Sequence, residues 1–81
     1  MKTSKSFINK QSCTKIANIL REWAVLGGCD AYDTFLTKEK CDNAADQFEI
    51  QRDKNGGNYF SNIINRPFFN DDEIDVIINM I

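Results

Sequence analysis

Hydrophobic residues recur at the spacing of one helical face over residues 10–26. The positions that stand three or four residues apart are Ile16, Ile19, Leu20, Trp23 and Leu26. Polar residues occupy the opposite side, which is the pattern of an amphipathic helix. Asn9 or Ser12 can cap the start, and the two glycines at 27–28 can adopt the positive φ that often ends a helix. We therefore predict a helix from Lys10 to Leu26 with this stripe in the core.

The middle of the chain predicts two further helical segments. Residues 30–36 place apolar side chains at i, i+1, i+4 and i+5, which suits two turns of helix. Thr37 can then cap a helix over residues 38–52. The apolar stripe of that helix would consist of Cys41, Ala44, Ala45 and Phe48.

A strong chain break follows at residues 53–58, where Asn and Gly cluster. Residues 48–52 alternate between apolar and polar, and Asn-Gly is a hairpin signal, so this stretch could pair with residues 58–63 as a hairpin. We prefer a helix on both sides of the break. The side chains that would share a helical face after it are Tyr59, Phe60, Ile63 and Ile64.

The last segment carries the clearest helix start. Asn70 can act as the N-cap and Glu73 stands three residues later, as in a capping box. Phe69 precedes the cap, where it can form a hydrophobic staple with Ile74. We predict a helix from Asp71 to near the end of the sequence. Its apolar face would consist of Ile74, Ile77, Ile78 and Ile81.

These patterns predict an all-α fold, a compact bundle of four to five short helices. The alternative is an α+β fold with a hairpin around residues 48–63. With 81 residues the chain has room for one domain, which we assign to residues 1–81. Residues 1–8 would form a basic arm that could be flexible. No internal repeat is evident in the sequence.

Charge is unevenly distributed along the chain. The formal net charge is −2, but residues 1–28 hold five basic residues against one acid, a balance of +4. The remaining 53 residues hold five basic residues against eleven acids, a balance of −6. Such a molecule could attract a second copy of itself or present its acidic body to a basic partner. Phosphate contacts need the opposite sign of charge, so we expect direct nucleic-acid binding by the acidic body to be disfavoured.

The cysteines indicate a reducing compartment. Cys13, Cys29 and Cys41 are an odd number without a CxxC pair, and the sequence contains no histidine. We therefore expect free thiols, no zinc site and no cofactor. The first residues lack the apolar stretch of a secretory signal, and the longest apolar run, residues 23–26, is too short to span a membrane. These features together predict a cytoplasmic protein, in a host cell if a phage encodes it.

Catalytic motifs are missing as well. Without histidine or a glycine-rich phosphate loop, the most common general base and nucleotide cradle are absent from the sequence. Residues 53–60 resemble the start of an EF-hand calcium loop, but Ile64 stands where that loop needs a glutamate. We expect a turn there, and we expect the protein not to be an enzyme.

The remaining hypothesis is a small protein–protein interaction protein that uses an acidic face. In its concrete form it is a phage- or mobile-element-encoded inhibitor of a host defence or nucleic-acid-processing complex, in an anti-CRISPR-like role, with a basic surface on the partner. The candidate partner-binding residues are Tyr32, Asp33, Glu49, Asp53, Phe68, Asp71, Asp72 and Asp75. The alternatives are a structural module that forms a homodimer through the C-terminal helix, and a small nucleic-acid binder that uses the basic N-terminus.

Overall fold

A computed structural model describes residues 6–31, 33–64 and 68–80 of the chain. Its elements are, in order, β1 (Phe7–Asn9), α1 (Lys10–Val25), β2 (Gly28–Ala31), β3 (Thr34–Thr37), α2 (Lys38–Asn55), β4 (Gly57–Tyr59), α3 (Phe60–Ile63) and α4 (Asp71–Ile78). Four helices and two small antiparallel sheets make the described residues an α+β fold. The predicted all-α class is therefore wrong.

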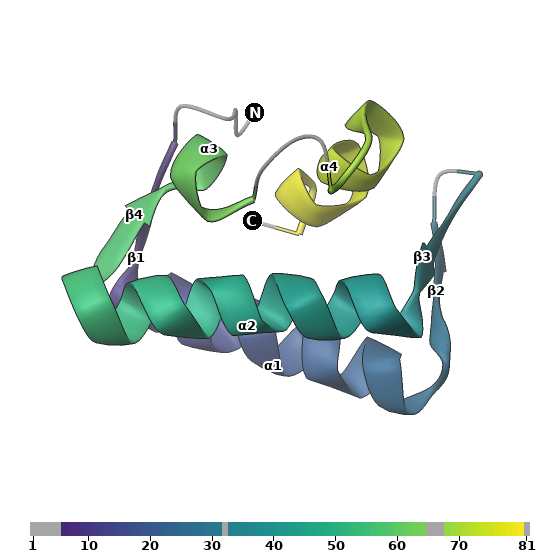
Figure 1. The fold of residues 1–81 in the computed structure, drawn as a ribbon, viewed down its shortest axis with the longest axis horizontal. Coiled ribbons are helices and arrows are strands. Elements are labelled where there is room, and N and C mark those ends of the chain that lie inside the picture. Colours follow the sequence, from purple (N-terminus) through teal and green to yellow (C-terminus); the bar gives the residue numbers. More distant parts are fainter. Residues whose placement is uncertain (1–5, 32, 65–67, 81) are drawn as a thin grey trace.

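The two long helices, α1 and α2, lie side by side and run in opposite directions (Figure 1). The β2–β3 hairpin connects them at one end of the molecule, and the β1–β4 pair lies at the other end. The short helices α3 and α4 cover one side of this helical pair (Figure 1). The core fills the space between these layers and contains Phe48, Phe60 and Phe69 among its largest side chains.

The segment predicted as two helical turns, residues 30–36, belongs to the β2–β3 hairpin instead. Cys29 lies opposite Leu36, and Ala31 lies opposite Thr34. Along β3 the side chains alternate, since Leu36 is buried while its neighbours on both sides are exposed. The hairpin becomes possible because Asp33 adopts a φ of 59° at the turn, a conformation that Asp tolerates better than most residues.

The alternative hairpin around residues 48–63 does not form either. The helix predicted over residues 38–52 is present as α2 and continues to Asn55, and Gly56 ends it with a φ of 69°. The strand that follows, β4, pairs with β1, where Phe7 lies opposite Tyr59. Residues 1–8 were predicted to form a basic arm, but Phe7 and Ile8 belong to strand β1. Residues 1–5 lie outside the described part of the chain.

The first and last helices form where the sequence predicts them. Asn9 caps α1 by accepting a hydrogen bond from the Ser12 amide, 2.8 Å away. Leu26, expected in the apolar stripe, is instead exposed beyond the helix end. In α4 the capping box is complete, and Ile77 is buried while Val76 adds a buried side chain that the predicted stripe did not include.

The structure contains an internal repeat, because β3–α2–β4 repeats the arrangement of β1–α1–β2. The first strand of each unit pairs with the last strand of the other unit: β1 pairs with β4, and β3 pairs with β2. The two units are therefore related by an approximate twofold axis. Each helix begins after a capping residue, Asn9 or Thr37. The fourth residue of each helix is a buried cysteine. Its thiol sulfur lies near the carbonyl oxygen of the residue five positions earlier, at 3.6 Å for Cys13 and 3.7 Å for Cys41.

The sequence carries faint traces of this repeat at an offset of 28 residues. The pairs are Phe7 and Phe35, Ile8 and Leu36, Lys10 and Lys38, Cys13 and Cys41, Ala17 and Ala45, and Leu20 and Phe48. At the two glycine pairs, residues 27–28 and 56–57, the offset becomes 29. The two ends of the molecule are thus structural equivalents whose surfaces carry different side chains.

Candidate functional site

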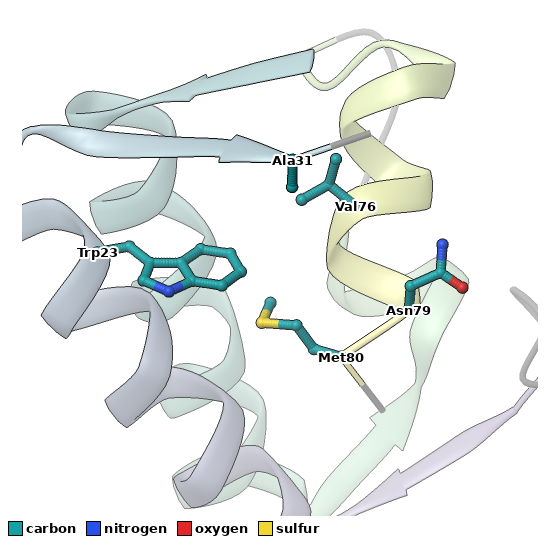
Figure 2. A pocket seen from close by; sticks show the side chains of 5 residues that line it. All are labelled: Trp23, Ala31, Val76, Asn79 and Met80. Atoms are coloured by element: carbon teal, nitrogen blue, oxygen red, sulfur yellow. The ribbon is translucent and has the colours of Figure 1, made fainter. Parts of the chain in front are cut away.

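A pocket of about 260 Å³ opens between α1, the end of β2 and α4. Its lining residues are Trp23, Ala31, Val76, Asn79 and Met80. Figure 2 shows the Trp23 ring reaching from α1 toward α4, with Met80 facing it across the pocket. The Asn79 amide points away from the ring, so the inner wall of the pocket is apolar (Figure 2).

The aromatic ring comes to this place because the core takes only part of the α1 stripe. The buried residues of α1 are the large Ile16 and Leu20 and the small Cys13, Ala17 and Ala24. Trp23 lies at the border of this face and remains half-buried. One side of the indole packs on the core, which leaves the remainder to line the pocket.

Two acidic residues share the side of α4 on which the pocket opens, although they are not among its lining residues. Asp72 and Asp75 are exposed, and they stand one or two helical turns before Asn79 on the same side of the helix. Asp72 also lies one turn before Val76, which lines the pocket. The strand β3 packs against α4, and the exposed Asp33 directly precedes this strand.

Unlike the three aspartates of α4, Glu73 is buried, and its hydrogen bonds hold the helix in place. Glu73 is only 5% exposed. It accepts hydrogen bonds from the Lys40 ammonium at 2.7 Å and from the Asn70 amide at 2.9 Å. Because these donors satisfy Glu73 internally, the outward charge of α4 comes from Asp71, Asp72 and Asp75.

Phe68 lies just before this helix, and about half of its surface is exposed. Its ring packs edge to face on Phe69, with centroids 4.9 Å apart. The Lys40 ammonium lies 5.3 Å from the centroid of the Phe68 ring. The predicted contact residue Phe68 is thus exposed, and the side chains shown to contact its ring are those of Phe69 and Lys40.

Two predicted contact residues lie outside this region. Glu49 on α2 accepts a hydrogen bond from Arg21 at 2.7 Å, and the same guanidinium binds Asp42 and Asp46. Asp53 is paired with its neighbour Arg52 at 2.8 Å. These carboxylates hold α1 and α2 together or lie near the β1–β4 end, so they do not extend the acidic border of the pocket. Tyr32 lies outside the described residues.

The paired carboxylates of α2 make stability depend on pH. A hydrogen bond from Lys38, assisted by Arg21, lowers the pKa of Asp42 below its ordinary value, and Arg52 does the same for Asp53. Lowered pKa values in the folded state mean that the unfolded chain binds more protons in acid. The stabilisation is therefore complete above the ordinary aspartate pKa of about 4 and is lost as the pH falls below it.

Urea unfolding at a series of pH values between 7 and 2.5 checks this expectation. We expect the urea midpoint to fall below about pH 4. The double variant Asp42→Asn, Asp53→Asn should start from a lower midpoint at pH 7 and show a smaller fall. An identical pH dependence in the variant and the parent protein would contradict the assignment to these two groups.

The thiols are arranged for packing. Cys13 and Cys41 are buried, and Cys29 is partly buried. Burial is the largest cause that raises the pKa of each thiol, to about 11 for Cys41, so all three stay protonated near neutral pH. Within the described ranges, no group of three or more Cys, Asp or Glu side chains is arranged so that it could hold a metal ion. In the same part of the chain, no helix has the length and apolar character needed to cross a membrane.

Sequence reasoning identified the acids of α4 but not the pocket beside them. The pocket depends on Ala31 and Met80 meeting Trp23 from elements far apart in the sequence. The available signal was the presence of one tryptophan in a helix whose core face already holds enough smaller apolar residues. No protein-family model matches the chain, and neither the curated proteins nor the solved structures contain a significant match.

Proposed function

We propose that this protein is a non-catalytic binding module that receives a lysine or arginine side chain of a partner protein in the Trp23 pocket. The observation that carries the proposal is the location of an aromatic, apolar pocket beside the exposed carboxylates of α4. A basic side chain combines an apolar stem with a charged head. The stem matches the pocket wall, and the head can reach the acidic border.

The indole itself favours such a ligand. Cations near the face of a tryptophan are attracted to its ring, more strongly than to tyrosine or phenylalanine. Met80 adds a polarisable thioether on the opposite wall. Carboxylates such as Asp72 and Asp75 would speed the encounter with a basic surface and disfavour acidic partners.

The proposed partner is a protein with a basic surface, and a nucleic-acid-handling complex is the class that fits best. Such proteins carry the positive grooves that bind phosphates. Small size and an acidic body support the narrower proposal of a phage- or mobile-element-encoded inhibitor that acts in the host cytoplasm. The homodimer alternative gains less support, because Ile77 is buried in the chain's own core and Ile74 and Ile78 pack against that core.

Fluorescence of Trp23, the single tryptophan, tests the proposal directly. We expect a saturable change in its emission on titration with an arginine-rich peptide. A glutamate-rich peptide of the same length should cause no saturable change. The double variant Asp72→Lys, Asp75→Lys should weaken binding of the arginine-rich peptide at least about tenfold, since each of two lost attractions and two new repulsions acts at short range.

The control is Asp30→Lys, which changes the charge on β2 by two units, as Asp72→Lys or Asp75→Lys alone does on α4. Asp30 is exposed and precedes Ala31, so it points to the opposite face of the sheet. This variant should bind the peptide nearly as well as the parent protein. Equal weakening by both sets of changes would mean that overall charge alone drives binding, and the pocket would not be the site.

Capture from a lysate would then identify the natural partner. The tagged parent protein and the Asp72→Lys, Asp75→Lys variant are compared as baits after nuclease treatment, with mass spectrometry of the retained proteins. A partner retained by the parent and lost by the variant supports the proposal. Identical sets of retained proteins would oppose it.

A further inference from the structure

The opposite end of the molecule carries a second surface of different chemistry. On the β1–β4 sheet, Phe7 and Tyr59 lie directly across from each other. Their rings meet edge to face with centroids 5.4 Å apart, yet 54% of Phe7 and 52% of Tyr59 remain exposed. Two neighbouring exposed rings on a strand pair are a surface on which flat groups can stack.

Basic residues stand where the two strands that carry these rings join α1 and α2. Lys10 begins α1 directly after β1, and Lys54 lies in the last turn of α2 just before β4. Arg52 reaches across from α2 and donates a hydrogen bond to the Thr14 hydroxyl on α1 at 3.2 Å. An open hollow of about 620 Å³ runs along the same face of α1, and its lining residues are Lys10, Gln11, Thr14, Lys15 and Asn18.

The charge at this end is positive. Among the described residues of the first two turns of α1 and the last turn of α2, four are basic and one is acidic; they are Lys10, Lys15, Arg52, Lys54 and Asp53. The single acid is already paired with Arg52. Asp53 also acts on Lys10, and the formal charges of these five residues still sum to +3.

Side-chain amides lie on the other face of this strand pair, because Asn58 precedes Tyr59 and stands opposite the buried Ile8. Asn58 donates a hydrogen bond to Gln51 at 3.0 Å and accepts one from Asn62 at 3.0 Å. Asn55 donates to the same Gln51 oxygen at 2.7 Å. These hydrogen bonds link α2 to β4 and α3, and the amides do not belong to the face that carries the two rings.

We propose that this end binds a single-stranded polynucleotide, with bases stacked on Phe7 and Tyr59 and phosphates on Lys10, Lys15 and Lys54. Exposed aromatic rings inside a positive surface are the shared feature of proteins that bind single strands. In a duplex the bases are already stacked on one another, so the rings would have no free base faces to contact. The surface is separate from the Trp23 pocket, and the proposal is independent of the function assigned to that pocket.

The internal repeat supplies a comparison surface within the same chain. Phe35 is the equivalent of Phe7 and is 56% exposed, but Asp30 lies opposite it where Tyr59 lies opposite Phe7. The β2–β3 end therefore has the same exposed phenylalanine without the second ring. A general stickiness of exposed phenylalanines would appear at both ends, whereas stacking of bases would appear only at the β1–β4 end.

The test is fluorescence anisotropy with a labelled 12-nucleotide RNA of mixed sequence, the same sequence as single-stranded DNA, and its duplex. We expect both single strands to bind more tightly than the duplex, and a difference between RNA and DNA would show which the surface prefers. Phe7→Ala and Tyr59→Ala should each weaken binding by about fivefold to a hundredfold. Lys10→Ala should weaken it and lower the slope of log affinity against log salt by about 0.7.

Phe35→Ala and Lys38→Ala are the matched controls at equivalent positions of the other unit, and both should leave binding unchanged. Equal losses in Phe7→Ala and Phe35→Ala would overturn the proposal, as would preference for the duplex or no binding of any strand at low salt. Sedimentation without nucleic acid provides the remaining arm. Salt-sensitive self-association that Lys10→Ala abolishes would assign the basic end to the acidic face of a second copy and would also overturn it.

Discussion

Replacing Gly57 by alanine should destabilise the protein by at least about 3 kcal/mol. A Cβ atom there would clash with the carbonyl oxygen of Ile8 and stand 3.0 Å from Cα of Asn9. Gly57 also has a φ of 122°, which residues with a side chain rarely adopt. Because both neighbours are backbone atoms of the paired strand β1, relief requires the β1–β4 pair to separate. Thermal unfolding followed by circular dichroism should show a fall in Tm of more than about 10 °C.

The neighbouring Gly56 provides a control with the same chemical change. It has a φ of 69°, and a Cβ atom there would meet nothing within 4 Å. Gly56→Ala should therefore cost only about 1 kcal/mol from backbone strain. The internal repeat adds Gly28→Ala, where a Cβ would lie 2.6 Å from the Leu36 oxygen, and we expect a large loss there too. Similar small losses at all three positions would contradict the close strand approach.

The sequence predicts the long helices well because their signals are local. The cap at Asn9, the cap at Thr37 and the capping box of Asn70 and Glu73 lie within four residues of the helices that they start. The strands are short, and their partners are distant. β1 pairs with β4 across some fifty residues, so no local pattern in three residues could indicate the pairing.

The internal repeat escaped sequence analysis for a related reason. Both units keep a lysine at the first helical position and a buried cysteine three residues later. Most other matched positions differ, because each helix packs on different neighbours outside the α1–α2 contact. The change of offset between the helix starts and the glycine pairs further hides the similarity.

In the candidate sites too, the sequence predicted the features that depend on local structure and missed those that depend on tertiary packing. The exposure of Asp71, Asp72 and Asp75 follows from the helical period, so the sequence could predict it. The pairing of Glu49 with Arg21 depends on the packing of α1 on α2, and the sequence alone predicted an available carboxylate. The stacking surface required Phe7 and Tyr59 to become neighbours, which only the fold provides.

Lys40→Met should destabilise the protein by about 2 to 3 kcal/mol, because it leaves a buried charge without its counter-ion. Glu73 is buried and would keep the backbone amide of Asn70 as a hydrogen-bond donor. The ammonium group also lies within 6 Å of the rings of Phe68 and Phe69, so its loss removes a second favourable interaction. Urea unfolding at pH 7 measures the effect.

The double variant Lys40→Met, Glu73→Gln distinguishes a stranded charge from lost packing. Glutamine can still accept the hydrogen bond from the Asn70 amide but carries no charge, so it should recover part of the loss and make the two changes non-additive. Lys38→Met is the control on the same helix, since its solvent-exposed pair with Asp42 should contribute little to stability. If Lys40→Met were no worse than Lys38→Met, the buried pair would not hold α4 on α2. The Trp23 pocket, whose far wall is α4, would then depend on apolar contacts alone.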